Sequence, residues 1–196
     1  MKTIILTLSI SLAALVSSAQ QSKSSVEQSK PSAEQSSKSG NPDIDSRGYL
    51  VKIGDKAPDK FSLLLQDGSR TSLKELKGKL VILQFTASWC EVCREEMPYL
   101  ERDIWQAYKD KGVVLIGVDR DEPIEVVQKF HKDMNISYPL ALDPGAAIFQ
   151  QFADKKAGVT RNVVIDREGH IRFLTRLYTK EEFAKLVTVV DELSKN

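Results

Sequence analysis

The sequence has few of the residues that hold metal ions or build disulfide frameworks. Its 196 residues include two cysteines, Cys90 and Cys93, and two histidines. A structural zinc site needs four ligands, and neither His131 nor His170 lies at zinc-ligand spacing from the cysteines. We therefore expect no metal centre. Two cysteines in one local motif are also too few for a disulfide scaffold.

An excess of charge of one sign is also missing. The chain has 28 basic and 27 acidic residues, which leaves a net charge of +1. Proteins that bind nucleic acid usually present a basic surface, so we expect no nucleic-acid partner. The hydrophobic content of 41% and the charged content of 28% are typical of a soluble globular protein.

The apolar run at the N-terminus, residues 4–16, is shorter than the ~20 residues that a membrane-spanning helix needs. It follows Lys2 and precedes the small residues "SSA". This pattern predicts a secretory signal peptide over residues 1–19, with an uncleaved anchor as the alternative. No cysteine follows the run, so lipid attachment is not expected. We expect the mature protein in the periplasm or outside the cell.

Residues 20–47 are rich in Ser, Gln and Lys, and their basic and acidic residues are equal in number. Such a segment buries too little apolar surface to offset the entropy of ordering it, so we expect a flexible linker. Residues 48–196 remain, and a chain of about 150 residues can fold as one domain.

Strands and helices alternate along this domain. The patterns predict a central mixed sheet, parallel at its core and antiparallel at its edge, with helices on both faces. The expected strands are residues 61–65, 70–72, 80–87 and 113–119, then "YPLALD", "NVVID" and "HIRFL". The expected helices are residues 90–109, then "EPIEVVQKFHKDM", "AAIFQQFA" and "TKEEFAKLVTVVDELSKN".

Three local features refine the helix predictions. Pro98 is expected to kink the first helix. Asp121 is a candidate cap for the second helix, with Pro123 in its first turn. Thr179 is expected to cap the last helix, with Glu182 completing a capping box.

The stretch "FTASWCEVCREEMP" contains both cysteines, between a buried strand and a helix. A CxxC pair in that setting predicts a thioredoxin-like redox motif. A structural disulfide is the main alternative, but a ring this short constrains the unfolded chain little. A c-type haem site needs CxxCH, and Arg94 occupies the histidine position. We therefore expect a redox-active disulfide and no other cofactor.

The two cysteines are expected to have different roles. At the start of a helix, Cys90 faces unpaired backbone N–H groups and the positive end of the helix dipole. Both stabilise a thiolate and lower the thiol pKa below its free value of roughly 8.5. Cys93 lies one turn later, so Cys90 is the expected nucleophile and Cys93 the resolving thiol. We expect Trp89 to pack beside the motif.

The domain resembles the TlpA/ResA-like branch of the thioredoxin superfamily, which comprises exported thiol–disulfide oxidoreductases. The resemblance covers most of Lys52 to Glu192 and rests on "GDKAPDKFSL", "WCEVCREEMP", "VLIGVDRDEP" and "GVTRNVVIDREGHI". It implies a thioredoxin fold with an N-terminal β-hairpin and a helical insertion. It also implies protein thiols or disulfides as substrates and a separate membrane or periplasmic electron donor. We expect a monomer.

Two neighbours of the motif bear on proton transfer. Glu96 lies three residues after Cys93 and can share its helix face. By resemblance it matches the active-site glutamate of ResA-like reductases, and it could accept the Cys93 proton if burial raises its pKa. The alternative is a solvated surface acid. Gln84 occupies the strand position where thioredoxins carry a buried aspartate, and a glutamine cannot act as a base.

The loop expected to face the cysteines departs from the family pattern. Thr160 stands where a cis-proline is expected. A cis bond before a non-proline residue costs ~3 kcal/mol, so we expect a trans Val159–Thr160 bond rather than a strained cis one. The stretch Val159–Arg161 remains the candidate substrate-docking loop, although the usual docking is then in doubt.

Arg161 suggests an alternative activity. A loop arginine near a cysteine is a feature of peroxiredoxins, which usually have a threonine three residues before the reactive cysteine and a proline seven before. Ala87 and Leu83 occupy those positions here. Arg161 could otherwise be a surface cation near Asp166 or Glu168. A thiol peroxidase and a non-catalytic, redox-sensitive binding module are therefore the alternatives.

The favoured interpretation is a protein-disulfide reductase that uses the Cys90–Cys93 dithiol. The acidic Glu91 beside Cys90 disfavours the thiolate and makes the pair more reducing. Val92 and Pro98 complete the motif as supporting residues. The substrate is left open among cytochrome maturation, envelope-protein repair and general disulfide reduction.

Overall fold

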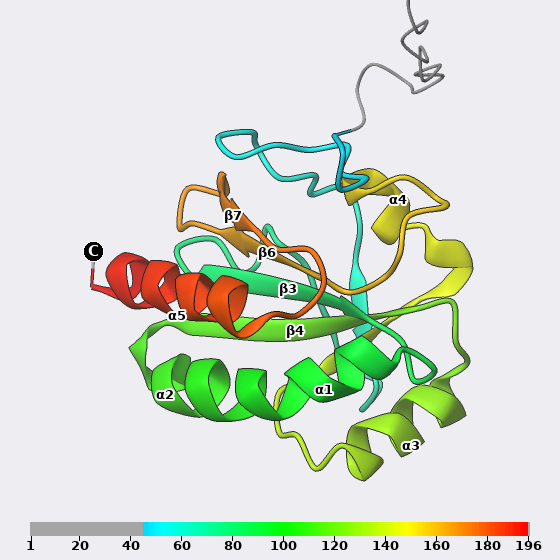
Figure 1. The fold of residues 1–196 in the computed structure, drawn as a ribbon. Helices are drawn as coiled ribbons and strands as arrows, with labels where there is room; N and C mark the ends of the chain where they lie inside the picture. The colour runs from blue at the N-terminus through cyan, green and yellow to red at the C-terminus, as the bar shows by residue number, and fades with distance from the viewer. Residues whose placement is uncertain (1–44, 196) are drawn as a thin grey trace, which may run out of the picture. The chain divides into compact units, whose positions relative to one another are not determined.

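The computed structural model describes residues 45–195, so the expected signal peptide and most of the expected linker lie outside the described part (Figure 1). A seven-stranded sheet forms its centre, in the order β2-β1-β5-β4-β3-β6-β7. Its strands are β1 (Leu63–Leu65), β2 (Arg70–Thr71), β3 (Leu80–Thr86), β4 (Val113–Arg120), β5 (Leu140–Asp143), β6 (Arg161–Ile165) and β7 (Ile171–Leu174). The helices are α1 (Glu91–Tyr99), α2 (Gln106–Tyr108), α3 (Ile124–Asp133), α4 (Phe149–Phe152) and α5 (Lys180–Ser194).

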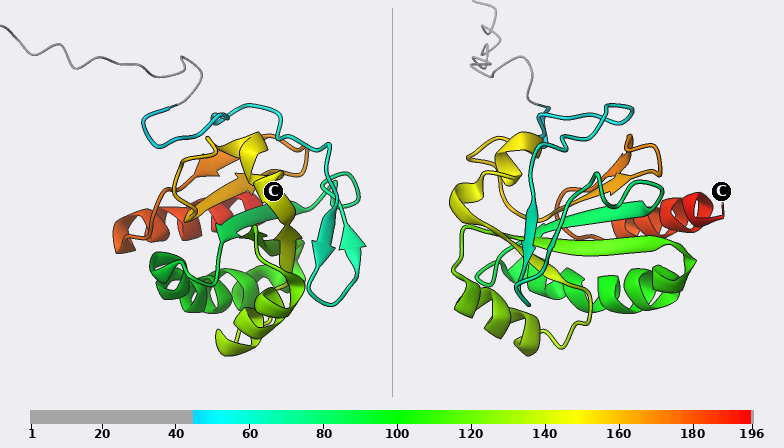
Figure 2. Two further views of the ribbon diagram at one scale, coloured as in Figure 1. Left: turned by 90° about the vertical axis from the view of Figure 1, so that its right-hand side faces the viewer. Right: turned by 180° about the vertical axis from the view of Figure 1, so that it is seen from behind.

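The sheet is mixed, as expected from the sequence. Strands β3, β4 and β5 run parallel to one another at its centre. The outer pairs β1–β2, β1–β5, β3–β6 and β6–β7 are antiparallel. The left view of Figure 2 shows the β1–β2 hairpin at one side of the domain and α5 at the other. All seven residues of β3 are buried, as its continuous apolar run predicts.

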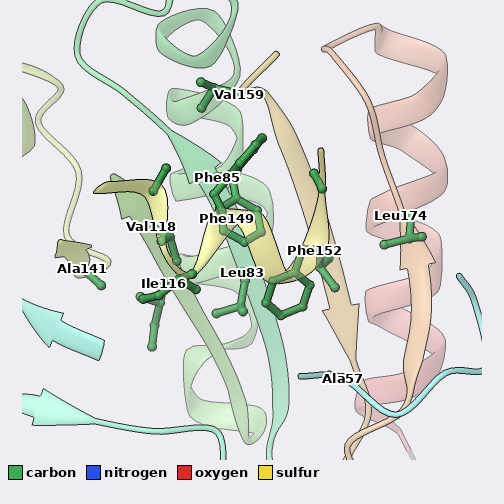
Figure 3. Packing of buried hydrophobic residues seen from close by; sticks show 14 of the residues in the cluster. Ala57, Leu83, Phe85, Ile116, Val118, Ala141, Phe149, Phe152, Val159 and Leu174 are labelled. Carbon is green, nitrogen blue, oxygen red and sulfur yellow. The ribbon is translucent and has the colours of Figure 1, made fainter. Parts of the chain in front are cut away.

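The alternation of side chains along the strands divides the core into two clusters. Leu83 and Phe85 of β3 pack against Phe149 and Phe152 of α4 on one face of the sheet (Figure 3). Their neighbour Ile82 points to the other face, where α1, α3 and α5 pack. Successive residues of a strand face opposite sides of the sheet. This alternation decides which polar residues of β3 and β6 can approach α1.

The first long helix is interrupted after Pro98. Helix α1 ends at Tyr99, a π-helical segment follows over Leu100–Trp105, and α2 completes the element. We expected a kink at Pro98; the structure has a change of helical winding two residues later. A proline removes one backbone donor from the helix, and a wider turn is one way for a helix to accommodate such a loss.

The helix caps match the predictions only in part. The hydroxyl oxygen of Thr179 accepts a hydrogen bond from the Glu182 backbone N–H at 3.1 Å, so the cap of α5 is confirmed. The Glu182 carboxylate instead accepts from the Arg176 N–H. The predicted Asp121 cap is wrong, because Pro123 is the N-cap of α3. Asp121 has a positive φ and accepts a hydrogen bond from the Gly145 N–H at 2.7 Å.

Candidate active site

The two cysteines form a disulfide at the start of α1, directly after the central strand β3. Cys90 is the N-cap of α1, and its Sγ accepts a hydrogen bond from the Cys93 backbone N–H at 3.2 Å. Cys90 is 9% exposed, whereas Cys93 has no exposed surface. The expected placement of both cysteines is therefore confirmed, and of the two only Cys90 can be reached from solvent.

The segment before Cys90 is fixed by one acidic residue. The Glu122 carboxylate accepts hydrogen bonds from the Ser88 N–H and from the Ser88 hydroxyl, both at 2.6 Å. Trp89 follows Ser88 and is 66% exposed, so the expectation that it packs beside the motif is wrong. Val92 is half-buried, while Glu91 is exposed. Pro98 is also exposed, at the far end of α1.

Glu96 is buried, which excludes the surface-acid alternative. It is 1% exposed and points from α1 toward the sheet. Its Oε1 accepts a hydrogen bond from Asn162 Nδ2 at 2.7 Å, and its Oε2 accepts from Gln84 Nε2 at 3.4 Å. Burial raises the pKa of Glu96 from 4.5 to about 7, against the opposing effect of the two hydrogen bonds. A carboxyl group that titrates near neutrality can exchange protons under physiological conditions.

Gln84 connects Glu96 to a second buried group. Its Oε1 accepts a hydrogen bond from the Tyr138 hydroxyl at 2.8 Å. A second hydrogen bond also holds the Asn162 side chain in place, because its Nδ2 donates to Thr175 Oγ1 at 2.9 Å as well as to Glu96. Neither Asn162 nor Tyr138 was predicted from the sequence. Side chains alternate between the two faces of a strand, so Asn162 lies on the same face of β6 as Val164, two residues further on. Val164 packs on the α1 side of the sheet, and this alternation could have identified Asn162.

Thr160 lies against both sulfur atoms. Its Oγ1 is 3.1 Å from Cys90 Sγ and 3.2 Å from Cys93 Sγ. No peptide bond within residues 45–195 is cis, so the expectation of a trans Val159–Thr160 bond is confirmed. Val159 and Thr160 are both buried. The loop therefore places a hydroxyl group where the family pattern has a proline ring.

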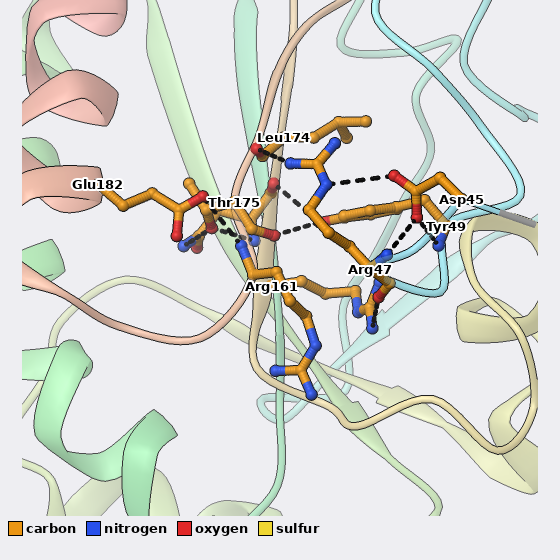
Figure 4. A network of polar contacts seen from close by, with 9 residues as sticks. Asp45, Arg47, Tyr49, Arg161, Leu174, Thr175 and Glu182 are labelled. Atoms are coloured by element: carbon orange, nitrogen blue, oxygen red, sulfur yellow. Dashed lines mark hydrogen bonds and ion pairs between the residues drawn. The ribbon is translucent and has the colours of Figure 1, made fainter. Parts of the chain in front are cut away.

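Arg161 points away from the cysteines, and the alternative of a surface cation near Asp166 or Glu168 is wrong because the residue is buried. Its side chain has no exposed surface, and its guanidinium lies over the rings of Tyr49 at 4.4 Å and Phe149 at 5.5 Å. Its Nη2 donates hydrogen bonds to the carbonyl oxygen of Gly158 and to that of Arg47, which Figure 4 shows. Thr160 and Arg161 are consecutive, so their side chains face opposite sides of the sheet. Arg161 belongs to the α4 side.

Asp119 is a second buried acid that the sequence analysis did not select. It lies next to the last residue of β4, opposite Thr86 of β3, and neither of its carboxyl oxygens has a hydrogen-bond partner among the described residues. Burial, reinforced by the negative charge of Glu122, raises the pKa of Asp119 to about 8. This carboxyl group therefore holds its proton to a higher pH than an exposed aspartate does, and it lies close to Glu122, the residue that holds Ser88.

Among residues 45–195, no group of three or more His, Cys, Asp or Glu side chains is arranged to hold a metal ion. In the same part of the chain, no helix is both long enough and apolar enough to cross a membrane.

Comparison with known proteins gives one consistent family. Residues 53–174 match the AhpC/TSA family. The thiol-disulfide oxidoreductase ResA of Bacillus thuringiensis subsp. konkukian is 34% identical over 151 residues, which cover 72% of this chain and 85% of the relative. The ResA of Bacillus cereus is 34% identical over 147 residues, which cover 73% of this chain and 83% of the relative.

Solved structures show the same fold. The solution structure of a protein described as a disulfide isomerase from Bacteroides thetaiotaomicron has a TM-score of 0.74 and 56% identity, covering 77% of this chain and 95% of that one. The crystal structure of a protein described as a thiol:disulfide interchange protein DsbE from Chlorobium tepidum has a TM-score of 0.66 and 26% identity, and the match covers 74% of this chain and 99% of that one. The expected thioredoxin fold is therefore confirmed. The chain belongs to the AhpC/TSA family of the thioredoxin superfamily, and within it to the ResA-like thiol–disulfide oxidoreductases.

Proposed function

We propose that this oxidoreductase is exported and reduces disulfides in other proteins, with Cys90 as its nucleophile. The observation that carries the proposal is the difference in exposure between the two sulfurs. Cys90 is 9% exposed at the N-terminus of α1, and Cys93 is fully buried behind it. A substrate disulfide can approach only Cys90. Export is supported by the signal-peptide pattern of residues 1–19.

The reaction transfers two electrons from the enzyme to the substrate. The Cys90 thiolate attacks one substrate sulfur, the substrate disulfide breaks, and its second sulfur leaves as a thiolate that takes up a proton. Cys93 then loses its proton and attacks Cys90 Sγ, which releases the first substrate sulfur as a thiol. The enzyme is left with the Cys90–Cys93 disulfide. A separate dithiol donor, in the membrane or the periplasm, reduces it for the next cycle.

Glu96 is the proposed proton acceptor for Cys93. The two residues lie one helical turn apart on α1, on its buried face. A general base works best when its pKa is near the operating pH, and burial raises the pKa of Glu96 to about 7. The hydrogen bonds from Asn162 and Gln84 hold the carboxylate in place. The side-chain amide of Gln84 cannot act as a base near neutral pH, so the role falls to Glu96.

The reducing direction is supported by the charge next to the nucleophile. Glu91 is exposed in the first turn of α1, where its negative charge opposes the formation of the Cys90 thiolate. Destabilising the reduced form favours the disulfide and so makes the dithiol a stronger reductant. The buried stretch Val159–Arg161 is the proposed edge of the docking site, with Trp89 as an exposed apolar contact for the substrate.

Turnover of a model protein disulfide tests the proposal. Insulin reduction with dithiothreitol as the donor is expected for the wild-type protein and is lost in Cys90→Ser. Cys93→Ser is expected to stall as a mixed disulfide at Cys90, which mass spectrometry detects. Circular dichroism checks that both variants fold. Full turnover by Cys90→Ser would contradict the assignment of the nucleophile, and no turnover by the wild type would contradict the reductase activity itself.

A thiol peroxidase is the second candidate, because Arg161 is a loop arginine of the kind that peroxiredoxins have near their reactive cysteine. It would consume hydrogen peroxide and would keep activity in Cys93→Ser when an external thiol resolves the oxidised Cys90. The position of Arg161 argues against it, since the guanidinium packs on Tyr49 and Phe149 on the α4 side of the sheet. A peroxide-consumption assay on wild type and Cys93→Ser separates the two activities.

A further inference from the structure

The hydroxyl group of Thr160 touches the atoms that react. Its Oγ1 is 3.1 Å from Cys90 Sγ and 3.2 Å from Cys93 Sγ. We propose that Thr160 is a catalytic hydrogen-bond donor, which stabilises the negative charge on whichever of the two sulfurs is a thiolate during the redox cycle. This inference rests on the proposed function in one respect, namely that Cys90 and Cys93 alternate between disulfide and dithiol.

The direction of the hydrogen bond follows from the oxidation state. In the disulfide neither sulfur carries a hydrogen, so the hydroxyl is the only possible donor. Within residues 45–195 the two sulfurs are its only hydrogen-bond partners. Thr160 is 3% exposed, so solvent hardly competes for the hydroxyl. A buried hydroxyl without a hydrogen-bond partner destabilises the fold, because its lost hydration is not replaced, so the hydroxyl of Thr160 is expected to keep its bond to the sulfurs.

The backbone on both sides of the hydroxyl is held by other bonds. The Thr160 carbonyl oxygen accepts from the Leu177 N–H at 3.1 Å and from Arg176 Nη1 at 3.2 Å. The next residue, Arg161, is anchored through Nη2 to the Gly158 carbonyl oxygen at 2.9 Å. The hydroxyl therefore stays close to the sulfurs when the disulfide opens. A donor that is already in position needs little reorganisation when charge develops.

The bond gains strength when a sulfur becomes charged. A disulfide sulfur is a weak acceptor, whereas hydrogen bonds to ionised groups are roughly twice as strong as neutral ones. When a thiolate of the electron-donor protein attacks Cys90 Sγ, the Cys90–Cys93 bond breaks and its electron pair stays on Cys93, within reach of the Thr160 hydroxyl. The second thiol of the electron-donor protein then attacks its own sulfur in the mixed disulfide, and Cys90 leaves as the thiolate. One hydroxyl between the sulfurs serves both steps.

This role cannot be filled by the residue that the family pattern has at this position. A proline ring has no hydrogen to donate, whereas threonine places a donor at the same point of the loop. We therefore expect Thr160 to favour the reduced form of the enzyme. The effect opposes that of Glu91, so the redox equilibrium of the enzyme depends on both residues.

The test compares Thr160→Val, which keeps the shape of the side chain and removes the donor, with Thr160→Ser, which keeps the donor. Thr86→Val is the matched control, because it removes a buried threonine hydroxyl whose sulfur partner is Met97 rather than a cysteine. Cys90 ionisation is followed by thiolate absorbance in the reduced proteins. The thiol–disulfide equilibrium is measured against glutathione, and Thr160→Ala is measured in parallel in case valine disturbs folding.

We expect Thr160→Val to lower the fraction of Cys90 thiolate at a given acidic pH about tenfold, a size typical of one hydrogen bond to a charged group. Its equilibrium constant should shift about tenfold toward the disulfide, or roughly 30 mV for a two-electron couple. Thr160→Ser should restore both values, and Thr86→Val should leave both unchanged. Equal values in wild type, Thr160→Val and Thr160→Ala would overturn the proposal. Failure of the proposed reductase function would appear separately, as absent insulin turnover by the wild type.

Discussion

Replacing Glu96 with glutamine should change how the stability of the protein depends on pH. Glu96 is 1% exposed, and burial raises its pKa from 4.5 to about 7. In the folded protein the carboxyl group therefore keeps its proton over a pH range in which the unfolded chain has released it. Since the folded state binds more protons there, the free energy of unfolding falls as the pH rises from about 4.5 to about 7.

The size of the effect follows from the shift. One pKa unit corresponds to about 1.36 kcal/mol, so a rise from 4.5 to about 7 corresponds to about 3 kcal/mol. Glu96→Gln removes this titration and keeps an oxygen that can accept the hydrogen bond from Asn162. The free energy of unfolding of Glu96→Gln, relative to wild type, should therefore increase by up to about 3 kcal/mol between pH 4 and pH 8.

Urea denaturation of the oxidised proteins at several pH values measures this difference. The closed disulfide prevents thiol titration, and the titration of Asp119, which both proteins share, cancels in the comparison. Glu95→Gln is the matched control, because it makes the same substitution at the exposed neighbour on the same helix. If the difference in free energy of unfolding between Glu96→Gln and wild type changes no more with pH than that of Glu95→Gln, a raised pKa of the buried Glu96 is refuted. In the reduced proteins, Glu96→Gln should also shift the titration of Cys93.

Two further substitutions separate binding from chemistry. Trp89→Ala should leave the free energy of unfolding within about 0.5 kcal/mol of wild type, because the side chain is 66% exposed. It should slow insulin reduction but not the reduction of a small disulfide, and equal rates on insulin would remove Trp89 from the docking site. Arg161→Met should slow the consumption of hydrogen peroxide no more than it slows insulin reduction, because the guanidinium packs on Tyr49 and Phe149; a selective loss of peroxide consumption in this variant would instead support a peroxidase-like arginine.

The sequence predicted the elements that depend on local patterns. The continuous apolar run of β3 and the CxxC at the start of α1 appear in the structure as expected. The cap at Thr179 is also present, because a cap is formed by residues close together in the chain. These features need no knowledge of which distant segments meet.

The environment of the site depended on pairing between distant strands. Asn162 reaches Glu96 because β6 lies antiparallel beside β3, with Asn162 opposite Gln84. That register also turns Arg161 to the α4 side, where it is buried rather than exposed. Ser88, which precedes the exposed Trp89, donates a hydrogen bond to Glu122, which is 34 residues further along the chain. A local pattern contains none of these contacts.

The redox potential of the Cys90–Cys93 pair tests most directly whether this enzyme reduces disulfides or forms them. The oxidised and reduced fractions are measured after equilibration with glutathione or dithiothreitol buffers of defined ratio. We predict a potential nearer to about −270 mV, as in thioredoxin, than to about −120 mV, as in a strong oxidant. A value above about −180 mV would contradict the reductase direction.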